Sequence, residues 1–370
     1  MSDQEILRNW VCMNPFKYLD IQENFSWVCC PSWITLTPIS RHYELENNGE
    51  ITIAEDWFNG EIIKDIRHSV LDGSYEYCDK KVCPHLSEIV NNKQPTHPLP
   101  IITRAEFQEQ YLKEKDPITF VEEFKEGPEE ILFGFDRACN LKCPSCRDDT
   151  VINLKEEDPL QIKKRKIADI ITDNFAHNAK KLMITGSGDP FYSRAFRNYL
   201  QEFPIDNYPN MEMIHIITNG NLLNKKMWDS LNAKEFIRSI EFSVDAGTQH
   251  TYETQTRLNG DWNKLLQNIS FVATQEQIND ITLSMVVSEL NYTEMHTFWL
   301  TMTDLLKDFQ GNLTLNFRRI VHWQHSAYRP EDIRNISVFD RDHPQHDNFL
   351  TETNKIKDLP FVSHNFHEVI

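Results

Sequence analysis

Residues 131–147 read ILFGFDRACNLKCPSCR, an apolar, strand-like run that leads directly into three cysteines with the spacing C-x3-C-x2-C. Three thiolates within eight residues, on a loop that leaves a strand, can hold three irons of a 4Fe–4S cube and leave the fourth iron open to a non-protein ligand. A structural zinc site needs four ligands, and no fourth Cys or His lies beside this triplet. The stretch therefore predicts an open 4Fe–4S cluster on Cys139, Cys143 and Cys146.

Strand-like and helix-like segments alternate from residue 131 onward. The predicted strands are 131–135, 181–185, 213–218, 239–244, 281–287 and 313–318. Helical stretches lie between them, at 160–175, 225–231, 262–273 and 293–309. This alternation predicts an α/β fold with a parallel sheet and, in this order, a partial (β/α)6 TIM-like barrel. In such barrels, function gathers at the carboxyl ends of the strands.

Composition narrows the class of protein. The chain has 370 residues, with 38 Lys+Arg and 56 Asp+Glu, so its net charge is −18. This acidic balance argues against nucleic acid as a partner, because proteins bind nucleic-acid backbones by neutralising phosphates. No apolar run approaches the ~20 residues of a membrane helix, and the polar, acidic start is unlike a secretory signal. We therefore expect a cytoplasmic protein with no membrane partner.

Cysteines are confined to the first part of the chain, and the last of the eight is Cys146. In a reducing cytosol, clustered cysteines are more often metal ligands than disulfides. Together with the Pro- and Asn-rich segment at 91–99, their distribution predicts four regions. These are a cysteine-rich domain at 1–90, a linker at 91–129, the barrel at 130–325 and a C-terminal extension at 326–370.

Residues 135–147 resemble the cluster loop of the radical S-adenosylmethionine (radical SAM) enzymes. The resemblance implies that the open iron binds the amino and carboxylate groups of S-adenosylmethionine (AdoMet). It also implies that one electron cleaves AdoMet to a 5′-deoxyadenosyl radical, which takes a hydrogen atom from the substrate. One residue departs from the pattern, because Ser145 stands where the family usually has an aromatic residue over adenine. A zinc-bound or purely structural cysteine loop is the alternative.

The segment after the second predicted strand supports this resemblance. Gly186, Ser187, Gly188 and Asp189 stand where the family has a glycine-rich segment that binds the amino group of AdoMet. Glycines let the backbone approach a ligand closely, and a carboxylate suits an ammonium group. The alternative is an ordinary glycine-rich turn between a strand and a helix.

The fourth predicted strand ends in Ser243 and Asp245, which lie two residues apart and so face the same side. The segment resembles the one that contacts the ribose of AdoMet, and a hydroxyl and a carboxylate can both bind ribose hydroxyls. The alternative is a helix cap, because Asp and the nearby Thr248 also begin helices.

Five cysteines precede the predicted barrel: Cys12, Cys29, Cys30, Cys78 and Cys83. Their pattern resembles the auxiliary-cluster module called the twitch domain, a short relative of the SPASM domain, although that module usually follows the barrel. The resemblance implies a second 4Fe–4S cluster on Cys12, Cys29, Cys78 and Cys83, with Cys30 as the alternative to Cys29. A closed zinc site with four thiolates is also compatible with the spacing. A fully ligated cube has no open iron, so we expect it to serve electron transfer or substrate positioning.

Two weaker features lie near the end of the chain. Arg318 and Arg319 end the sixth predicted strand, where one of them either faces the cofactor or substrate or forms a salt bridge. Three pairs of histidines share the spacing H-x2-H, and we expect surface or core histidines rather than metal ligands: His322/His325, His343/His346 and His364/His367.

These patterns and resemblances predict a radical SAM enzyme with two 4Fe–4S clusters and AdoMet. Its substrate would be a peptide or a small metabolite, and its electron donor a flavodoxin or a ferredoxin. Two alternatives stay open: a radical SAM enzyme that modifies RNA, which the acidic balance disfavours, and a non-catalytic scaffold that binds zinc or a cluster.

Overall fold

The computed structural model describes residues 2–29, 43–47, 49–81, 83–92, 100–184, 187–322 and 326–366. The chain folds into two compact units. The first unit consists of Met1–Phe135, Lys163–Leu182 and Pro204–Glu212. The second unit consists of Asp136–Ile162, Met183–Phe203 and Met213–Ile370, and it contains the cysteine triplet.

Parallel strands form the sheet of the second unit, in the order β10-β11-β12-β13-β14. Their bounds are β10 (Met213–Thr218), β11 (Ile237–Ser243), β12 (Asp280–Val287), β13 (Asn312–Arg319) and β14 (Val362–His364). The first two predicted strands also form, as β8 (Glu130–Gly134) and β9 (Lys181–Ile184). All six predicted strands are therefore present, and the α/β class with parallel strands is confirmed.

Four of the helices that follow these strands are the predicted ones: α8 (Pro159–Phe175), α10 (Lys225–Asp229), α12 (Trp262–Ala273) and α13 (Met295–Leu305). The structure adds α9 (Arg194–Gln201), which the sequence did not predict. Polar side chains begin several of them, because Ser193, Asn224 and Asp261 each accept a hydrogen bond from a backbone N–H of the first turn. The later helices are α11 (Gln249–Thr251), α14 (Pro330–Ile336) and α15 (His346–Ile356). None of the described helices combines the length and apolar composition needed to cross a membrane.

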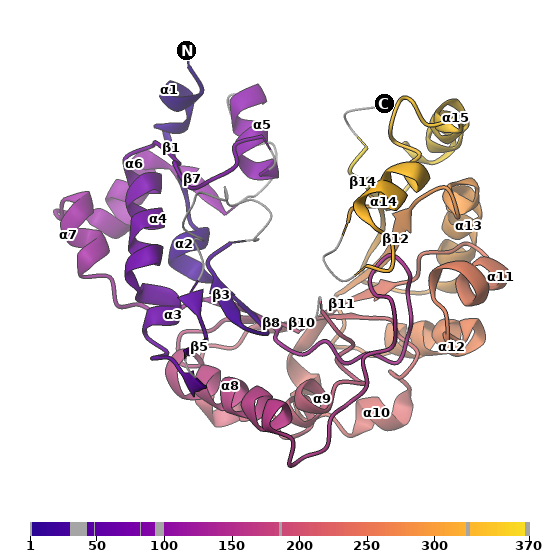
Figure 1. Ribbon diagram of the computed structural model, residues 1–370, viewed down its shortest axis with the longest axis horizontal. Helices are drawn as coiled ribbons and strands as arrows, with labels where there is room; N and C mark the ends of the chain where they lie inside the picture. The colour runs from indigo at the N-terminus through magenta and orange to yellow at the C-terminus, as the bar shows by residue number, and fades with distance from the viewer. Residues whose placement is uncertain are drawn as a thin grey trace. The chain divides into compact units, whose positions relative to one another are not determined.

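The strands of the second unit have one apolar face and one polar face. Figure 1 shows helices α10, α12 and α13 on one side of strands β10 to β12. The apolar face packs under the helices: Phe317 of β13 contacts Phe298 of α13 with ring centroids 5.5 Å apart. Residues on the other face of the same strands are polar, and they include Glu241, Ser284 and Arg318. The alternation of two residues along each strand thus separates a core from a polar surface.

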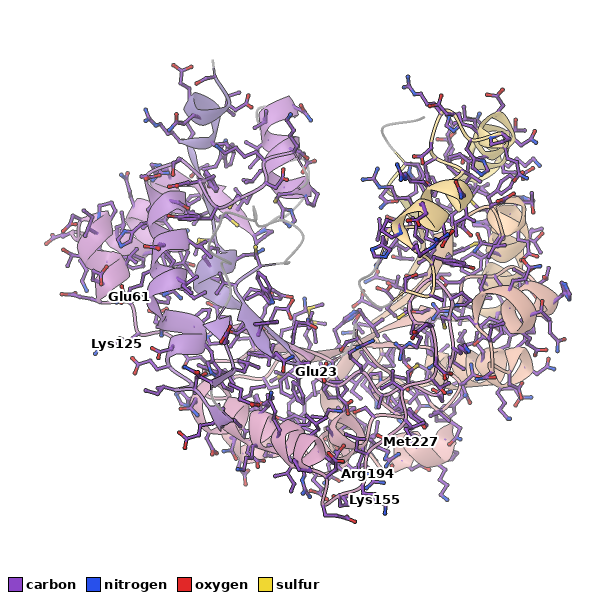
Figure 2. All side chains as sticks on the ribbon, viewed as in Figure 1. Glu23, Glu61, Lys125, Lys155, Arg194 and Met227 are labelled. Atoms are coloured by element: carbon purple, nitrogen blue, oxygen red, sulfur yellow. The ribbon has the colours of Figure 1, made fainter. Side chains whose placement is uncertain are left out.

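The segment after the cysteine triplet is fixed within the second unit. Arg194, at the start of α9, forms a salt bridge of 3.2 Å with Glu156, and its backbone N–H donates to Oδ1 of Asn153. Figure 2 labels Arg194 and Lys155, which lie close together at one edge of this unit. These contacts hold residues 153–156 against the helix.

The first unit pairs β8 with β2 (Tyr18–Gln22) in parallel and continues antiparallel to β3 (Phe25–Trp27) and β4 (Tyr43–Glu44). A separate antiparallel pair joins β1 (Trp10–Cys12) to β7 (Ile101–Thr103). Two further short strands pair with each other: β5 (Glu46–Asn47) and β6 (Glu50–Ile51). The helices are α1 (Asp3–Leu7), α2 (Asn14–Lys17), α3 (Asp56–Asn59), α4 (Glu61–Leu71), α5 (Pro84–Asn92), α6 (Arg104–Phe107) and α7 (Pro117–Glu122), with a π-helical turn at Gln108–Leu112. The segment at 101–122, within the predicted linker, is therefore structured.

A buried arginine lies at the centre of the first unit. Arg67 of α4 is fully buried, and its guanidinium carbon lies 4.4 Å from the ring centroid of Phe124 and 4.8 Å from that of Phe58. Its nitrogens donate to the carbonyl oxygens of Pro15 and Phe58 and to Oδ1 of Asn59. Burial lowers the pKa of Arg67 to about 9, and the aromatic rings with three acceptors stabilise the cation.

Candidate active site

The cysteine loop is buried and held on three sides. Cys139 and Cys143 are buried, and Cys146 packs against them. The backbone N–H of Cys139 donates to the carbonyl of Val151, and that of Lys142 donates to the carbonyl of Leu258. On the third side, the carbonyl of Pro144 accepts from Ala327 N and Ser326 Oγ, both at 3.1 Å. These bonds fix the positions from which the three sulfur atoms project.

Each sulfur of the triplet receives a hydrogen bond from a different polar side chain. Asn219, directly after β10, donates through Nδ2 to Sγ of Cys139 at 3.7 Å. Arg257 donates through Nη1 to Sγ of Cys143 at 3.3 Å, and Arg147 donates through Nη2 to Sγ of Cys146 at 3.3 Å. Two of these donors are distant in the sequence from the cysteine they contact, and the third, Arg147, directly follows Cys146.

Burial opposes ionisation of these thiols. It raises the pKa of Cys139 to about 12, and the nearby charge of Asp189 adds to the effect. It also raises the pKa of Cys143, although the positive charge of Arg257 opposes the rise. A bound metal would reverse this balance, because metal coordination deprotonates thiols.

Asp245 is held at the end of β11 in a conformation that is uncommon outside glycine. Its φ is +60°, within the left-handed region that Asp tolerates better than most residues. Its Oδ2 lies 2.6 Å from Nη2 of Arg257, and its Oδ1 accepts from the backbone N–H of Val286 at 2.7 Å. Its carbonyl accepts from Nδ2 of Asn291 at 2.8 Å. Ser243, two residues earlier, is partly buried and lies opposite Ser284 in the sheet register.

The loop that follows Asp245 is fixed by one carboxylate, that of Glu294. The backbone N–H groups of Gly247 and Thr248 donate to its Oε2 at 2.8 and 3.1 Å. The hydroxyls of Thr248 and Thr251 donate to its Oε1 at 2.8 and 2.6 Å. The helix cap that the sequence left open as the alternative role of this segment forms at Thr248, since its side chain also accepts from the N–H of Thr251.

Asp189 ties two strand ends together. Its Oδ1 accepts from the backbone N–H groups of Phe191 and Tyr192, both at 3.1 Å. Its Oδ2 accepts from Oγ1 of Thr218 at 2.7 Å and from the N–H of Asn219 at 3.0 Å. The carboxylate is 1% exposed, so in this structure it fixes the segment that carries the donor to Cys139.

The glycine-rich segment before Asp189 packs closely against the start of the cysteine loop. A Cβ on Gly188 would lie 2.5 Å from the carbonyl oxygen of Asp136, so no larger residue fits there. Oγ of Ser187 donates to that same carbonyl at 3.3 Å. Gly186, also predicted to bind the cofactor, lies outside the described residues.

A narrow cavity lies beside the cysteine loop, and its volume of about 20 Å³ is room for about one water molecule. Its walls combine apolar side chains such as Val286 and Ile320 with the carboxylate of Asp245. Ser145 and Tyr328 also line it. This type of lining is typical of small-molecule sites, but the cavity is far smaller than such a site.

The polar face of the sheet carries a second set of charged groups. Glu241 accepts from Oγ of Ser284 at 2.5 Å and forms a salt bridge of 3.1 Å with Arg318. The Arg318 side chain is 45% exposed. Of the two roles that the sequence left open for Arg318, the structure shows the salt bridge.

Three of the N-terminal cysteines come together in the first unit. Burial raises the pKa of Cys78 to about 12, and the charge of Cys83 adds to the rise. The pKa of Cys12 is raised by burial and by the charges of Cys78 and Cys83. Tyr75 lies beside them, because its hydroxyl accepts from the N–H of Cys12 at 3.2 Å. Cys29 is partly buried, and Cys30 lies outside the described residues.

No three His, Cys, Asp or Glu side chains in the described segments converge as they would around a single metal ion. In an iron–sulfur cube, each cysteine binds a different iron, so its sulfurs do not converge on one point. Two of the paired histidines bond to backbone carbonyls: His343 to Asn335 and His346 to Val338, each at 2.9 Å. His325 and His367 lie outside the described residues.

Sequence reasoning assigned no role to several residues that hold the site: Arg147, Arg257, Asn291, Glu294 and Tyr328. Their partners lie up to 114 residues away, as for Arg257 and Cys143. In the structure, the π-helical turn Tyr252–Thr256 directly precedes Arg257, and such turns are frequent at functional sites.

No family model and no curated protein matches this sequence. Among solved structures, a structure of anSMEcpe with bound AdoMet is similar at 17% identity, a TM-score of 0.38, and coverage of 60% of this chain and 59% of that chain. A structure of TYW1 with a lysine-pyruvate adduct bound is similar at 15% identity, a TM-score of 0.35, and coverage of 63% and 72%. The chain thus spans about 59% of the length of anSMEcpe. At these low scores, the function has to be argued from the residues of the site.

Proposed function

We propose that this chain is a radical SAM enzyme whose active centre is a 4Fe–4S cluster on Cys139, Cys143 and Cys146 with AdoMet as co-substrate. The observation that carries the proposal is the set of donors around the triplet. Each sulfur accepts from one polar side chain, and two of these side chains are cationic guanidinium groups.

The residues around the triplet fit a group rich in sulfur and negative charge. The Nε atoms of Arg147 and Arg257 are buried and have no hydrogen-bond partner within the described part of the chain. Buried donors without partners are rare in folded proteins and call for an acceptor. The sulfides and thiolates of a cluster supply such acceptors, and their charge matches the two cations.

A bound cluster would supply the electron for the reductive cleavage of AdoMet and so for radical removal of hydrogen from the substrate. The residues of this chain hold and orient the ligand. We assign the nucleoside to the surface around Ser145, Val286, Ile320 and Tyr328, because their side chains combine an apolar lining with the carboxylate of Asp245; the cavity between them would have to widen to admit it.

Polar contacts to AdoMet are assigned to two strand ends. Ser243 and Asp245 would bind the ribose hydroxyls. The segment of Gly186, Ser187, Gly188 and Asp189 would bind the amino group. Asp189 would act by fixing this segment, because both its oxygens already accept hydrogen bonds.

We further propose an auxiliary 4Fe–4S cluster on Cys12, Cys78 and Cys83 with Cys29, or Cys30 in its place, as fourth ligand. Its support is Tyr75, whose hydroxyl accepts from the N–H of Cys12 at 3.2 Å and whose carbonyl accepts from the N–H of Cys78 at 3.1 Å, so these two cysteines lie on either side of one residue. Such a cluster would transfer electrons or position the substrate. The substrate would be a peptide or a small metabolite, the electron donor a flavodoxin or a ferredoxin, and the compartment the cytoplasm, where thiols stay reduced.

Anaerobic purification followed by visible and Mössbauer spectroscopy tests the main proposal. The expected result is a brown protein that, once reduced, cleaves AdoMet slowly to 5′-deoxyadenosine. Cys139→Ala, Cys143→Ala and Cys146→Ala should each abolish cleavage. A colourless protein loaded with zinc, or full cleavage by any of the three variants, would refute the assignment.

The auxiliary cluster is tested by the double variant Cys78→Ala/Cys83→Ala. Iron content should fall from about eight to about four per chain while AdoMet cleavage is retained, because the triplet keeps its own cluster. Product formation should fall further than cleavage does. Unchanged iron content in the double variant, or zinc in place of iron, would refute the auxiliary cluster and leave the proposal of an enzyme with one cluster.

A further inference from the structure

Arg147 is a buried cation directly beside the triplet. It is 5% exposed. Its Nη1 donates to the carbonyl of Arg137 at 2.9 Å, and its Nη2 donates to the carbonyl of Ser187 at 2.9 Å and to Sγ of Cys146 at 3.3 Å. Within the described ranges, no carboxylate forms a salt bridge with it. A buried guanidinium without a carboxylate is unfavourable unless another negative group lies close by.

The polar contacts of Arg147 are two backbone carbonyls and the sulfur of Cys146, at 2.9, 2.9 and 3.3 Å. Its buried Nε still lacks an acceptor within the described residues. Geometry and charge therefore both direct this guanidinium toward whatever the three sulfurs hold.

Arg257 provides an internal contrast. It also donates to a sulfur of the triplet, that of Cys143, at 3.3 Å. However, its Nη2 lies 2.6 Å from Oδ2 of Asp245, whose side chain is 4% exposed. The carboxylate neutralises most of the field of this arginine at the sulfurs, whereas the charge of Arg147 is not neutralised in this way.

We propose that Arg147 is a positioning residue that raises the reduction potential of the cluster, an inference that rests on the proposed function. Reduction adds one electron from the reduced flavodoxin or ferredoxin, and no bond or proton is exchanged. The added negative charge is stabilised by the nearby cation, and hydrogen bonds to cluster sulfurs act in the same direction. Arg257, paired with Asp245, contributes less.

The test is a redox titration of the anaerobically reconstituted full chain, followed by electron paramagnetic resonance in the absence of AdoMet. Arg147→Met keeps the length of the side chain but removes charge and donors. We expect its ratio of reduced to oxidised cluster at a fixed potential to fall about tenfold, which for one electron is a shift of about 59 mV to lower potential. Arg147→Lys keeps the charge and should retain most of the wild-type potential.

Arg137→Met is the matched control. It removes an arginine from the same loop but keeps the backbone carbonyl that accepts from Arg147. This control should titrate like the wild type. Equal midpoint potentials for wild type and Arg147→Met, with equal iron content, would overturn the inference. If Arg147→Met loses iron, the midpoint potentials of Arg147→Gln and Arg147→Lys are compared instead. Equal potentials for these two variants would also overturn the inference.

The outcomes separate this inference from the proposed function. Wild-type protein that forms no four-iron cluster would refute both. Wild-type protein that forms the cluster and cleaves AdoMet, with no shift in the variants, would refute only the role of Arg147.

Discussion

Arg257 Nη2 lies 2.6 Å from Oδ2 of Asp245, and the same guanidinium donates through Nη1 to Sγ of Cys143. This single contact joins the end of β11 to the cysteine loop. The cysteine loop is also bonded through its backbone to the segment that carries Arg257, since Lys142 N–H donates to the carbonyl of Leu258, the residue after Arg257. Arg257 therefore links the cysteine loop to the predicted ribose segment within the second unit.

Breaking this buried pair should destabilise the protein. Asp245→Asn leaves the cation of Arg257 buried without its carboxylate, which costs about 3–5 kcal/mol. Urea denaturation under anaerobic, reducing conditions measures the loss in the free energy of unfolding. The matched control is Asp229→Asn, which breaks an exposed pair of 2.7 Å with Lys225 and should change stability by at most about 0.5 kcal/mol. Equal losses in the free energy of unfolding for the two variants would show that the buried pair contributes no more stability than the exposed pair.

Removal of the Ser243 side chain and removal of the Asp189 side chain should have different effects on AdoMet affinity and on the cluster spectrum. Ser243→Ala deletes a proposed ligand contact and should weaken AdoMet binding about tenfold, with the cluster spectrum unchanged. Asp189→Ala instead removes the carboxylate that accepts from four donors, including Asn219 N–H, and should alter the spectrum as well as the affinity. Equilibrium dialysis with AdoMet and visible circular dichroism give the two readouts. An unaltered spectrum in Asp189→Ala would mean that this carboxylate contacts the ligand rather than the site's framework.

The aromatic ring of Tyr328, rather than its hydroxyl, should contribute to AdoMet binding. It lines the same cavity as Ser145, and the segment that carries it is held to Pro144 by Ser326 and Ala327. Tyr328→Ala should weaken AdoMet binding about tenfold, whereas Tyr328→Phe should keep most of the affinity, because a stacked ring contributes about 0.5–1.5 kcal/mol beyond area burial. Leu300→Ala, on the exposed side of α13, is the control and should leave the affinity unchanged. Affinity lost equally in the Phe and Ala variants would point to the hydroxyl instead.

The stability of the first unit should fall as pH rises from about 4 to 7. Burial raises the pKa of Asp20 from 3.8 to about 7, partly opposed by its hydrogen bond from Gln22. In that window, the folded chain keeps a proton that the unfolded chain has released, so each step up in pH favours unfolding. The loss is on the order of 4 kcal/mol when complete, since each pKa unit corresponds to about 1.4 kcal/mol.

Asp20→Asn removes this titration. The variant should match the wild type near pH 4 and be more stable than it at pH 8, as measured by urea denaturation across the range. Asp116 offers a control of opposite sign, because hydrogen bonds from Thr119 and the backbone lower its pKa. Asp116→Asn should therefore lose stability above pH 4 rather than gain it. A constant difference between Asp20→Asn and wild type at all pH values would contradict the shifted pKa of Asp20.

Local patterns in the sequence predicted the strands and most of the helices after residue 130, and they singled out the cysteine motif. The strands from β8 to β13 were predictable because buried parallel strands are short apolar runs bounded by turn residues. The spacing of Cys139, Cys143 and Cys146 was also local, since three ligands within one loop need no knowledge of the rest of the chain. The cap at Thr248 belongs to the same class, because a helix start depends on neighbouring residues.

The tertiary structure alone decided which side chains meet. Nothing in the sequence linked Arg257 to both Asp245 and Cys143, or Glu294 to the loop at Gly247, because these contacts depend on how parallel strands bring their carboxyl ends to one edge. The same holds for Asp189, which the sequence suggested as a ligand contact and whose oxygens the fold uses to fix Asn219. Burial also distinguishes two arginines that the sequence places in the same loop. Of Arg147 and Arg137, only Arg147 is buried and donates to a cysteine sulfur. Desolvation and ion pairing depend on the folded structure, so the spacing of residues in the sequence could not predict them.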